Sequence, residues 1–230
     1  MMRGHYLREL QNLQDDLLVM GSMVIQALND GMDALKRQDL DAAKQLIAND
    51  REINARRFKI EEDCLTLIAT QQPMARDMRL LASTLEIAGE LERMGDYAKG
   101  IGKITLYIGK QPPVKPLVHM PQMCEKVVEM LRAALDAFVK EDVEAARTIP
   151  KRDDEVDALY NTINRELIDL IISNRANTDQ ANYLSWAAHN LERAADRVTN
   201  ICERIIYTAT GVFTEMDVKD EQAVGLKSAS

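Results

Sequence analysis

Apolar residues recur at intervals of three and four along most of this chain. In an α-helix that spacing places the side chains on one face, so each such segment is expected to bury one side. The clearest segment carries Leu184, Ala187, Ala188, Leu191, Ala195, Val198, Ile201, Cys202 and Ile205. An earlier segment repeats the pattern with Leu81, Leu85, Ala88, Leu91, Ala98 and Ile101. The pattern predicts long amphipathic helices.

Helix-capping and helix-breaking residues divide the chain into six predicted helices. Asp39 and Asp142 are suited to cap helix starts, and Gly211 is suited to end the last helix. The expected helices span residues 4–36, 39–71, 74–109, 117–139, 141–173 and 177–210. Pro150 lies inside the fifth, where it removes a backbone hydrogen bond, so that helix is expected either to kink there or to begin near Asp153.

The chain contains an internal repeat. The segment Leu91–Asp96 reappears one hundred positions later as Leu191–Asp196, and Asp39–Lys44 matches Asp142–Arg147 at a separation of 103. A duplicated sequence indicates a duplicated structural unit. The sequence therefore predicts an all-α fold of two tandem, pseudo-symmetric three-helix bundles. We expect the first bundle in residues 1–111, a linker in 112–116, the second bundle in 117–211 and a flexible tail in 212–230.

Composition agrees with a helical, globular protein. Hydrophobic residues make up 46% and charged residues 29% of the chain, with only 10 Gly and 6 Pro. The net charge of −8 and the lack of a Lys/Arg cluster argue against nucleic acid as a partner. Cys64, Cys124 and Cys202 form no Cys-x-x-Cys pair and are expected to be buried thiols. Without a signal peptide or an apolar stretch of ~20 residues, the chain is expected to be cytoplasmic, with no direct membrane insertion.

The repeated motif contains two acidic residues four positions apart. Such side chains are neighbours on one helical face, and two like charges there destabilise a helix unless a cation lies between them. The chain has three pairs of this kind and a fourth in which an amide replaces one acid: Glu92 with Asp96, Asp153 with Asp157, Glu192 with Asp196, and Asp50 with Asn54. A solvated charged face usually explains one such pair, but recurrence at equivalent positions favours a shared cation site. Carboxylates alone suit hard ions such as Mg²⁺, Mn²⁺, Ca²⁺ or iron, and the sequence does not choose among them.

An enzyme is the main alternative from another class of function. The chain has no glycine-rich phosphate loop and no nucleophile beside a base, which favours a non-enzymatic protein. A diiron oxidase in a helical bundle would need Glu-x-x-His on two helices. The residues three before the histidines are Met2, Pro116 and Trp186, so that motif is absent. A purely structural helical spacer, in which the acids serve only solvation, also remains open.

The paired Leu-Glu-Arg-x-x-Asp segments, with Ala75–Arg79 before the first and Ala188–Ile201 around the second, resemble the PhoU family of phosphate-transport regulators. The resemblance covers residues 4–211. It implies two pseudo-symmetric three-helix bundles and acidic motifs that hold metal ions, as iron clusters in some members, with Mg, Mn or Zn as other candidates. Carried over residue by residue, the implied ligands are Glu92, Asp96, Asp153, Asp157, Glu192, Asp196 and Asp50. Asn54 departs from the pattern, which puts the first repeat's share of a cluster in doubt.

The resemblance also implies a function without catalysis. Members of the family are adaptors that couple the ATPase subunit of a high-affinity phosphate ABC transporter to a sensor histidine kinase, and so repress the phosphate-starvation response and phosphate uptake. They commonly form homodimers. Two further interpretations are a carboxylate-ligated iron-binding protein and an accessory protein of a low-affinity phosphate permease.

Overall fold

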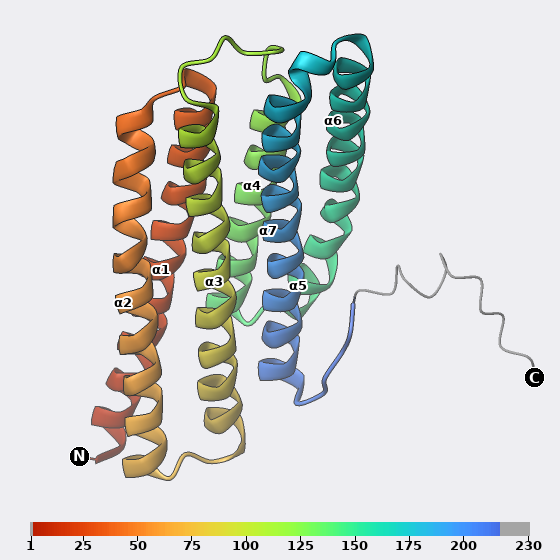
Figure 1. The fold of residues 1–230 in the computed structure, drawn as a ribbon. Helices are drawn as coiled ribbons and strands as arrows, with labels where there is room; N and C mark the ends of the chain where they lie inside the picture. Colours follow the sequence, from red (N-terminus) through yellow and green to blue (C-terminus); the bar gives the residue numbers. More distant parts are fainter. Residues whose placement is uncertain (1, 217–230) are drawn as a thin grey trace, which may run out of the picture.

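The computed structural model describes residues 2–216, which form long helices joined by short connections (Figure 1). The helices are α1 Met2–Arg37, α2 Leu40–Gln71, α3 Ala75–Ile108, α4 His119–Lys140, α5 Val143–Thr148, α6 Asp153–Ser173 and α7 Thr178–Thr210. Two 3₁₀ turns accompany them, η1 Ile149–Arg152 and η2 Arg175–Asn177. The predicted all-α fold is confirmed. Residues 217–230, most of the expected flexible tail, lie outside the described range.

The long helices form two bundles that share one boundary. Helices α1, α2 and α3 pack together, and so do α4, α6 and α7, while α3 against α7 and α1 against α4 join the two sets. The contact of α3 with α7 is the most extensive in the molecule, and α2 and α6 touch only helices of their own set, so they lie at the two outer edges (Figure 1). None of the helices within residues 2–216 combines the length and hydropathy of a membrane-crossing segment.

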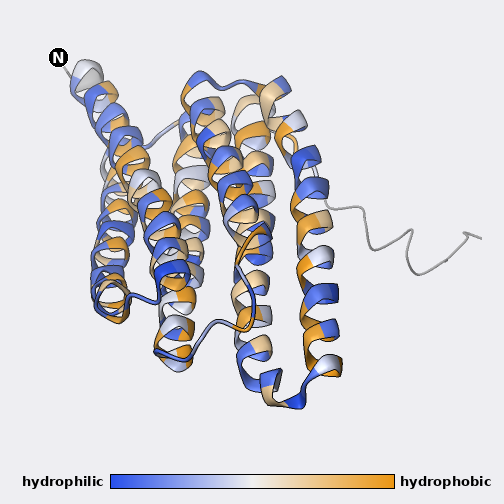
Figure 2. Ribbon diagram, turned by 90° about the horizontal axis from the view of Figure 1, so that it is seen from above, coloured by the Kyte–Doolittle hydropathy of each residue, from blue (hydrophilic) through white to orange (hydrophobic). Residues whose placement is uncertain are grey.

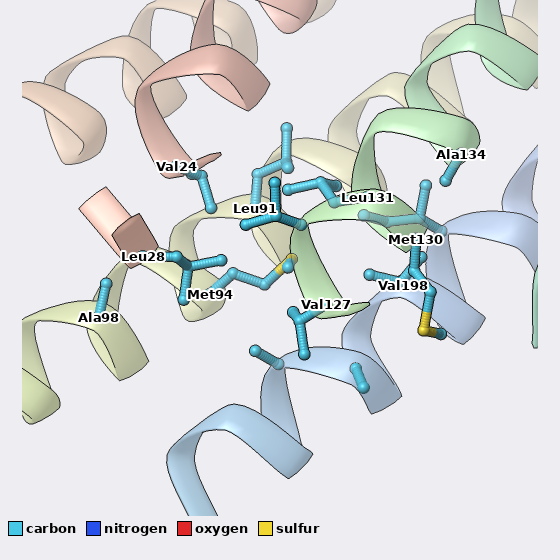
Figure 3. Packing of buried hydrophobic residues seen from close by; sticks show 14 of the residues in the cluster. Val24, Leu28, Leu91, Met94, Ala98, Val127, Met130, Leu131, Ala134 and Val198 are labelled. Atoms are coloured by element: carbon cyan, nitrogen blue, oxygen red, sulfur yellow. The ribbon is translucent and has the colours of Figure 1, made fainter. Parts of the chain in front are cut away.

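The predicted apolar stripes form the core. All nine residues of the stripe from Leu184 to Ile205 are buried, and so are those of the earlier stripe except Leu85, which is partly buried. Each helix therefore presents a hydrophobic and a hydrophilic side (Figure 2). Residues of both bundles meet in one cluster, shown in Figure 3 with Val24, Leu28, Leu91, Met94, Val127, Leu131 and Val198 among its members. Burial of each large aliphatic side chain contributes roughly 1.5–3 kcal/mol, so this shared core unites the bundles.

The predicted caps and the proline effect explain where the helices begin and end. Asp39 Oδ1 accepts hydrogen bonds from the backbone of Asp41 and Ala42 before α2, and Asp142 caps α5 in the same way. The single helix expected over residues 141–173 is wrong, because Pro150 cannot donate a backbone hydrogen bond and the chain there forms η1. The second long helix of that bundle begins at Asp153, as one of the two alternatives predicted.

The end of α7 is fixed by the residues that follow it. Gly211 has a φ of +77°, the left-handed conformation that ends a helix and suits glycine. Phe213 then stacks on Tyr207 with ring centroids 3.9 Å apart, and the backbone N–H of Met216 donates to Glu203 Oε1 at 2.8 Å. Residues 212–216 thus fold back onto α7.

The boundary between α3 and α7 is antiparallel and nearly two-fold symmetric. Glu90 of α3 accepts a hydrogen bond from Asn200 of α7, and a Cβ atom on Gly100 of α3 would lie 2.5 Å from Asn190 Nδ2 of α7. Positions 90 and 190 are equivalent in the two repeats, and so are positions 100 and 200. The contact of Glu90 with Asn200 is therefore the symmetry equivalent of the contact of Asn190 with Gly100. A larger residue at position 100 would require the Asn190 side chain to move.

Glu90 of α3 forms an ion pair and a hydrogen bond with residues of α7 across this boundary. Its side chain is 11% exposed, and its carboxylate lies 3.3 Å from Arg197 Nη1 and 3.2 Å from Asn200 Nδ2, both on α7. Arg93, on the same helix as Glu90, supplies a third contact at 3.2 Å. The Arg197 side chain is only 13% exposed, so the two buried charges depend on each other.

Glu90→Ala is expected to lower the free energy of unfolding by roughly 3 kcal/mol, because it leaves the buried Arg197 guanidinium without its carboxylate. Arg93→Ala is the matched control, with an expected loss below about 1 kcal/mol, because that side chain is 57% exposed. Urea denaturation measures both. Equal, small losses in the two variants would show that Glu90 does not tie the bundles together.

Candidate functional site

The predicted acidic residues form two groups, one in each bundle. The first acidic group joins Asp50 of α2 with Glu92 and Asp96 of α3. The second acidic group joins α6 and α7 and consists of Asp153, Asp157, Glu192 and Asp196. Each group lies where two helices of the same bundle face each other, so the repeat produces the same placement twice.

A lysine occupies the centre of the first acidic group. Lys99 Nζ lies 2.7 Å from Asp50 Oδ2 and 3.3 Å from Asp96 Oδ1. Asn54 Nδ2 donates a further hydrogen bond to Asp50 Oδ2 at 3.0 Å. The Asp50 side chain is only 7% exposed, so its charge needs a close partner, and the ammonium group supplies one. The first acidic group is therefore a closed ion-pair network between α2 and α3.

The pKa shifts agree with this arrangement. The hydrogen bond to Asp50 raises the pKa of Lys99, which holds the ammonium in its charged form. Burial raises the pKa of Glu92, and the neighbouring charge of Asp96 raises it further. Glu92 is thus the member of the first acidic group that the lysine leaves least compensated.

The second acidic group has no lysine at the equivalent place. The position one hundred residues after Lys99 is Thr199, which is buried. Burial raises the pKa of Glu192; His189 and Arg193 oppose the shift, and the charges of Asp157 and Asp153 add to it. The negative charges of Asp157 and Asp153 therefore act on the Glu192 carboxylate across the junction of α6 with α7.

Two contacts involve the remaining side chains of the second acidic group. His189 Nδ1 lies 3.3 Å from Glu192 Oε2, and Arg193 Nε lies 3.8 Å from Asp196 Oδ2. Both partners precede the acid by three residues on α7, one turn of the helix. Asp196 is thus placed beside Arg193, and its carboxylate contributes negative charge to the same side of the helix as Glu192.

The two groups differ in how well they suit a metal ion. Within the described residues 2–216, no three His, Cys, Asp or Glu side chains converge closely enough to hold one ion. The first acidic group does not fit a metal, because Lys99 places a positive charge between Asp50 and Asp96. The second acidic group has the oxygen donors that hard cations prefer, and Thr199 stands at its position equivalent to Lys99. Metal ligation by its four carboxylates remains a prediction.

Lys99 and Glu90 were not among the predicted site residues. Alignment of the two repeats carries a signal for Lys99, since it follows Asp96 by three residues and Thr199 replaces it in the second copy. Glu90 has a weaker signal, because its counterpart is Asn190 and its partners lie more than one hundred residues away in the sequence.

Comparison with known proteins gives a consistent result. The family model described as PhoU domain matches residues 17–105 and 120–205. A phosphate-specific transport system accessory protein PhoU homolog of Clostridium acetobutylicum is 35% identical over 96% of this chain and 100% of its own length. The accessory protein PhoU of Escherichia coli is 34% identical over 90% of this chain and 86% of its own.

Solved structures extend the likeness to the fold. The crystal structure of the phosphate transport system regulatory protein PhoU from Streptococcus pneumoniae has a TM-score of 0.85 and 29% identity, covering 92% of this chain and 100% of that one. PhoU from Pseudomonas aeruginosa also has a TM-score of 0.85, with 31% identity, over 90% of this chain and 100% of that one. The expected pair of tandem helical bundles is thereby confirmed.

Glu192→Gln is expected to raise the melting temperature at pH 7 in the presence of a chelator. Because the folded-state pKa of Glu192 lies above its unfolded value, this group contributes most to stability below the unfolded pKa, and the contribution is lost as pH rises through the folded pKa. The gain from Glu192→Gln should therefore disappear at about pH 4, below the ordinary Glu pKa of ~4.3. Scanning calorimetry between these pH values tests it.

The control for this pH dependence is Glu155→Gln, because the contact with Lys126 lowers the pKa of Glu155. That variant should lose stability at pH 7, the opposite sign. A lower melting temperature for Glu192→Gln at pH 7 would contradict the interpretation that burial, with the added charges of Asp157 and Asp153, makes the ionised Glu192 unfavourable.

Lys99→Thr, which introduces the second-repeat residue, is expected to lower the free energy of unfolding by roughly 3 kcal/mol, since it leaves the Asp50 carboxylate buried and unpaired. Millimolar Mn²⁺ should restore part of that loss in the variant and change the wild type less, because a cation can then replace the ammonium. Lys103→Thr, one turn farther along α3 and exposed, is the control. Equal stability of the two variants would refute the network.

Proposed function

This chain belongs to the PhoU family, and from that premise we propose that it is a non-enzymatic regulatory adaptor of a phosphate-specific transport system. In this proposal it acts in the cytoplasm, contacts the ATPase subunit of a high-affinity phosphate ABC transporter and a sensor histidine kinase, and represses the phosphate-starvation response and phosphate uptake while phosphate is plentiful. The working form is a homodimer.

The observation that carries the proposal is similarity along both repeats. The match to the Clostridium acetobutylicum accessory protein covers 96% of this chain and the whole of the relative, so the similarity includes both repeats. The long outer helices also suit contact with other proteins. Helical faces that extend over many turns are a common way in which proteins recognise one another.

We further propose that the second acidic group binds a metal ion. Burial raises the pKa of Glu192, and the charges of Asp157 and Asp153 add to the rise; a hard cation beside these carboxylates would offset both effects. Binding to the folded state would also stiffen the junction of α6 with α7. The first acidic group is left out of this proposal because Lys99 already supplies the positive charge there.

Deletion of the gene in its host is expected to leave a phosphate-responsive reporter active in phosphate-rich medium, and re-expression of the chain should restore repression. The reporter measures the regulatory role directly. Co-purification with the transporter's ATPase subunit and with the sensor kinase, each tested separately, then identifies the direct contact. Normal repression in the deletion strain would reject the proposal and favour service to a low-affinity phosphate permease instead.

A further inference from the structure

A groove runs along the outer surface of the first bundle between α1 and α2. Its larger part is a hollow of about 510 Å³, lined also by Gly95 of α3. A second hollow of about 270 Å³ continues toward the turn between α1 and α2. The two hollows share Asp30, Leu46 and Asn49 as lining residues, so they form one continuous groove, which we call the α1–α2 groove.

The α1–α2 groove is apolar at one end and acidic at the other. Its apolar part is lined by Leu18, Val19, Met23, Ala27 and Ile53. Its acidic part is lined by Asp30, Asp33 and Asp39, against the single basic side chain of Arg37. Exposed Glu52 adds another negative charge at the rim of the apolar part.

The second bundle is filled at the equivalent place. Upstream repeat positions differ by 103, so Met23 corresponds to Lys126, and Glu52 corresponds to Glu155. Lys126 Nζ lies 2.9 Å from Glu155 Oε2 and so spans α4 and α6 across this position. Beneath it Met130, only 1% exposed, stands where the first bundle has Ala27. The groove of the first bundle is open because a methionine cannot pair with Glu52 and an alanine does not fill the space.

These features define the chemistry of an occupant. A groove between two long helices accepts a third helix, whose apolar side chains enter the groove at intervals of three and four. The acidic end and rim favour Lys or Arg beside those anchors, because opposite charges across an interface guide association and reject like-charged segments. A second copy of this chain fits poorly, since the whole chain carries a net charge of −8. Residues 217–230 fit poorly as well, with three acidic and two basic residues.

We propose that the α1–α2 groove is the docking site for a basic amphipathic helix of a partner protein. The apolar face of that helix packs against Leu18, Met23 and Ile53, and its basic residues approach Asp30 and Asp33. This inference goes beyond the proposed function, because it holds for any partner that supplies such a helix.

The test uses the purified full chain and a fluorescein-labelled helical peptide of about 18 residues, or five helical turns, built from Leu and Lys in an amphipathic pattern. A second peptide carries Glu in place of every Lys. The double variant Met23→Lys, Ala27→Met introduces the second-bundle residues and should weaken binding of the Lys peptide by at least about tenfold, as judged by fluorescence anisotropy. The Glu peptide should bind at least about tenfold more weakly than the Lys peptide to the wild type.

Two controls keep the result interpretable. Lys126→Met changes the matching position of the second bundle and should leave binding of the Lys peptide unchanged. Asp30→Asn with Asp33→Asn alters only exposed side chains, and should weaken binding even if the double variant in the groove is poorly folded by circular dichroism.

Three outcomes would overturn the proposal: equal binding of the Lys peptide to the wild type and to folded groove variants, equal binding of the Glu peptide, or conversion of a dimer to a monomer by the groove variants in light scattering. The last result would identify a second copy of the chain as the occupant. None of these measurements involves phosphate signalling, so they fail or succeed separately from the reporter experiment on the deletion strain.

Discussion

Along α3 and α7, each helix must satisfy two sets of neighbours at once, those of its own bundle and those of the other. Their buried faces are correspondingly wide, and small residues such as Gly100 allow the backbones to approach closely. The buried carboxylate of Glu90 on this boundary is held by Arg197 and Asn200. Both acidic groups include residues of α3 or α7, and Gly95 of α3 lines part of the α1–α2 groove, so these two helices contribute to every site described.

The two copies differ at two lysine positions: Lys99 stands against Thr199, and Lys126 against Met23. In the first bundle Lys99 lies within the acidic group, and the groove between α1 and α2 is open. In the second bundle the acidic group has Thr199 instead, and Lys126 covers the place where the groove would be. A lysine thus lies inside the acidic group of the first bundle, whereas in the second bundle a lysine spans α4 and α6. The duplicated scaffold carries two different surfaces for the same backbone geometry.

Local patterns in the sequence were sufficient for the helices, the caps and most of the core. The stripe from Leu184 to Ile205 is buried because a 3.6-residue period fixes which side chains share a face. The disruption at Pro150 follows from the missing N–H of that one residue. The occupant of the first acidic group was not predicted, because Lys99 reaches Asp50 through a long, flexible side chain from another helix. The groove depends on packing across two helices, which periodicity does not describe.

The antiparallel boundary also affects how the chain is made. The face of α3 that packs against α7 is complete when Ile108 has been synthesised, but its partner ends at Thr210, about a hundred residues later. At typical synthesis rates of about 5–20 residues per second, roughly 5–20 s pass before α7 is available to pack against that face of α3. During this time the apolar face of α3 that packs against α7 in the folded protein is exposed. Translation speed and chaperone access over the second half of the chain therefore bear on how much of the protein reaches the paired state.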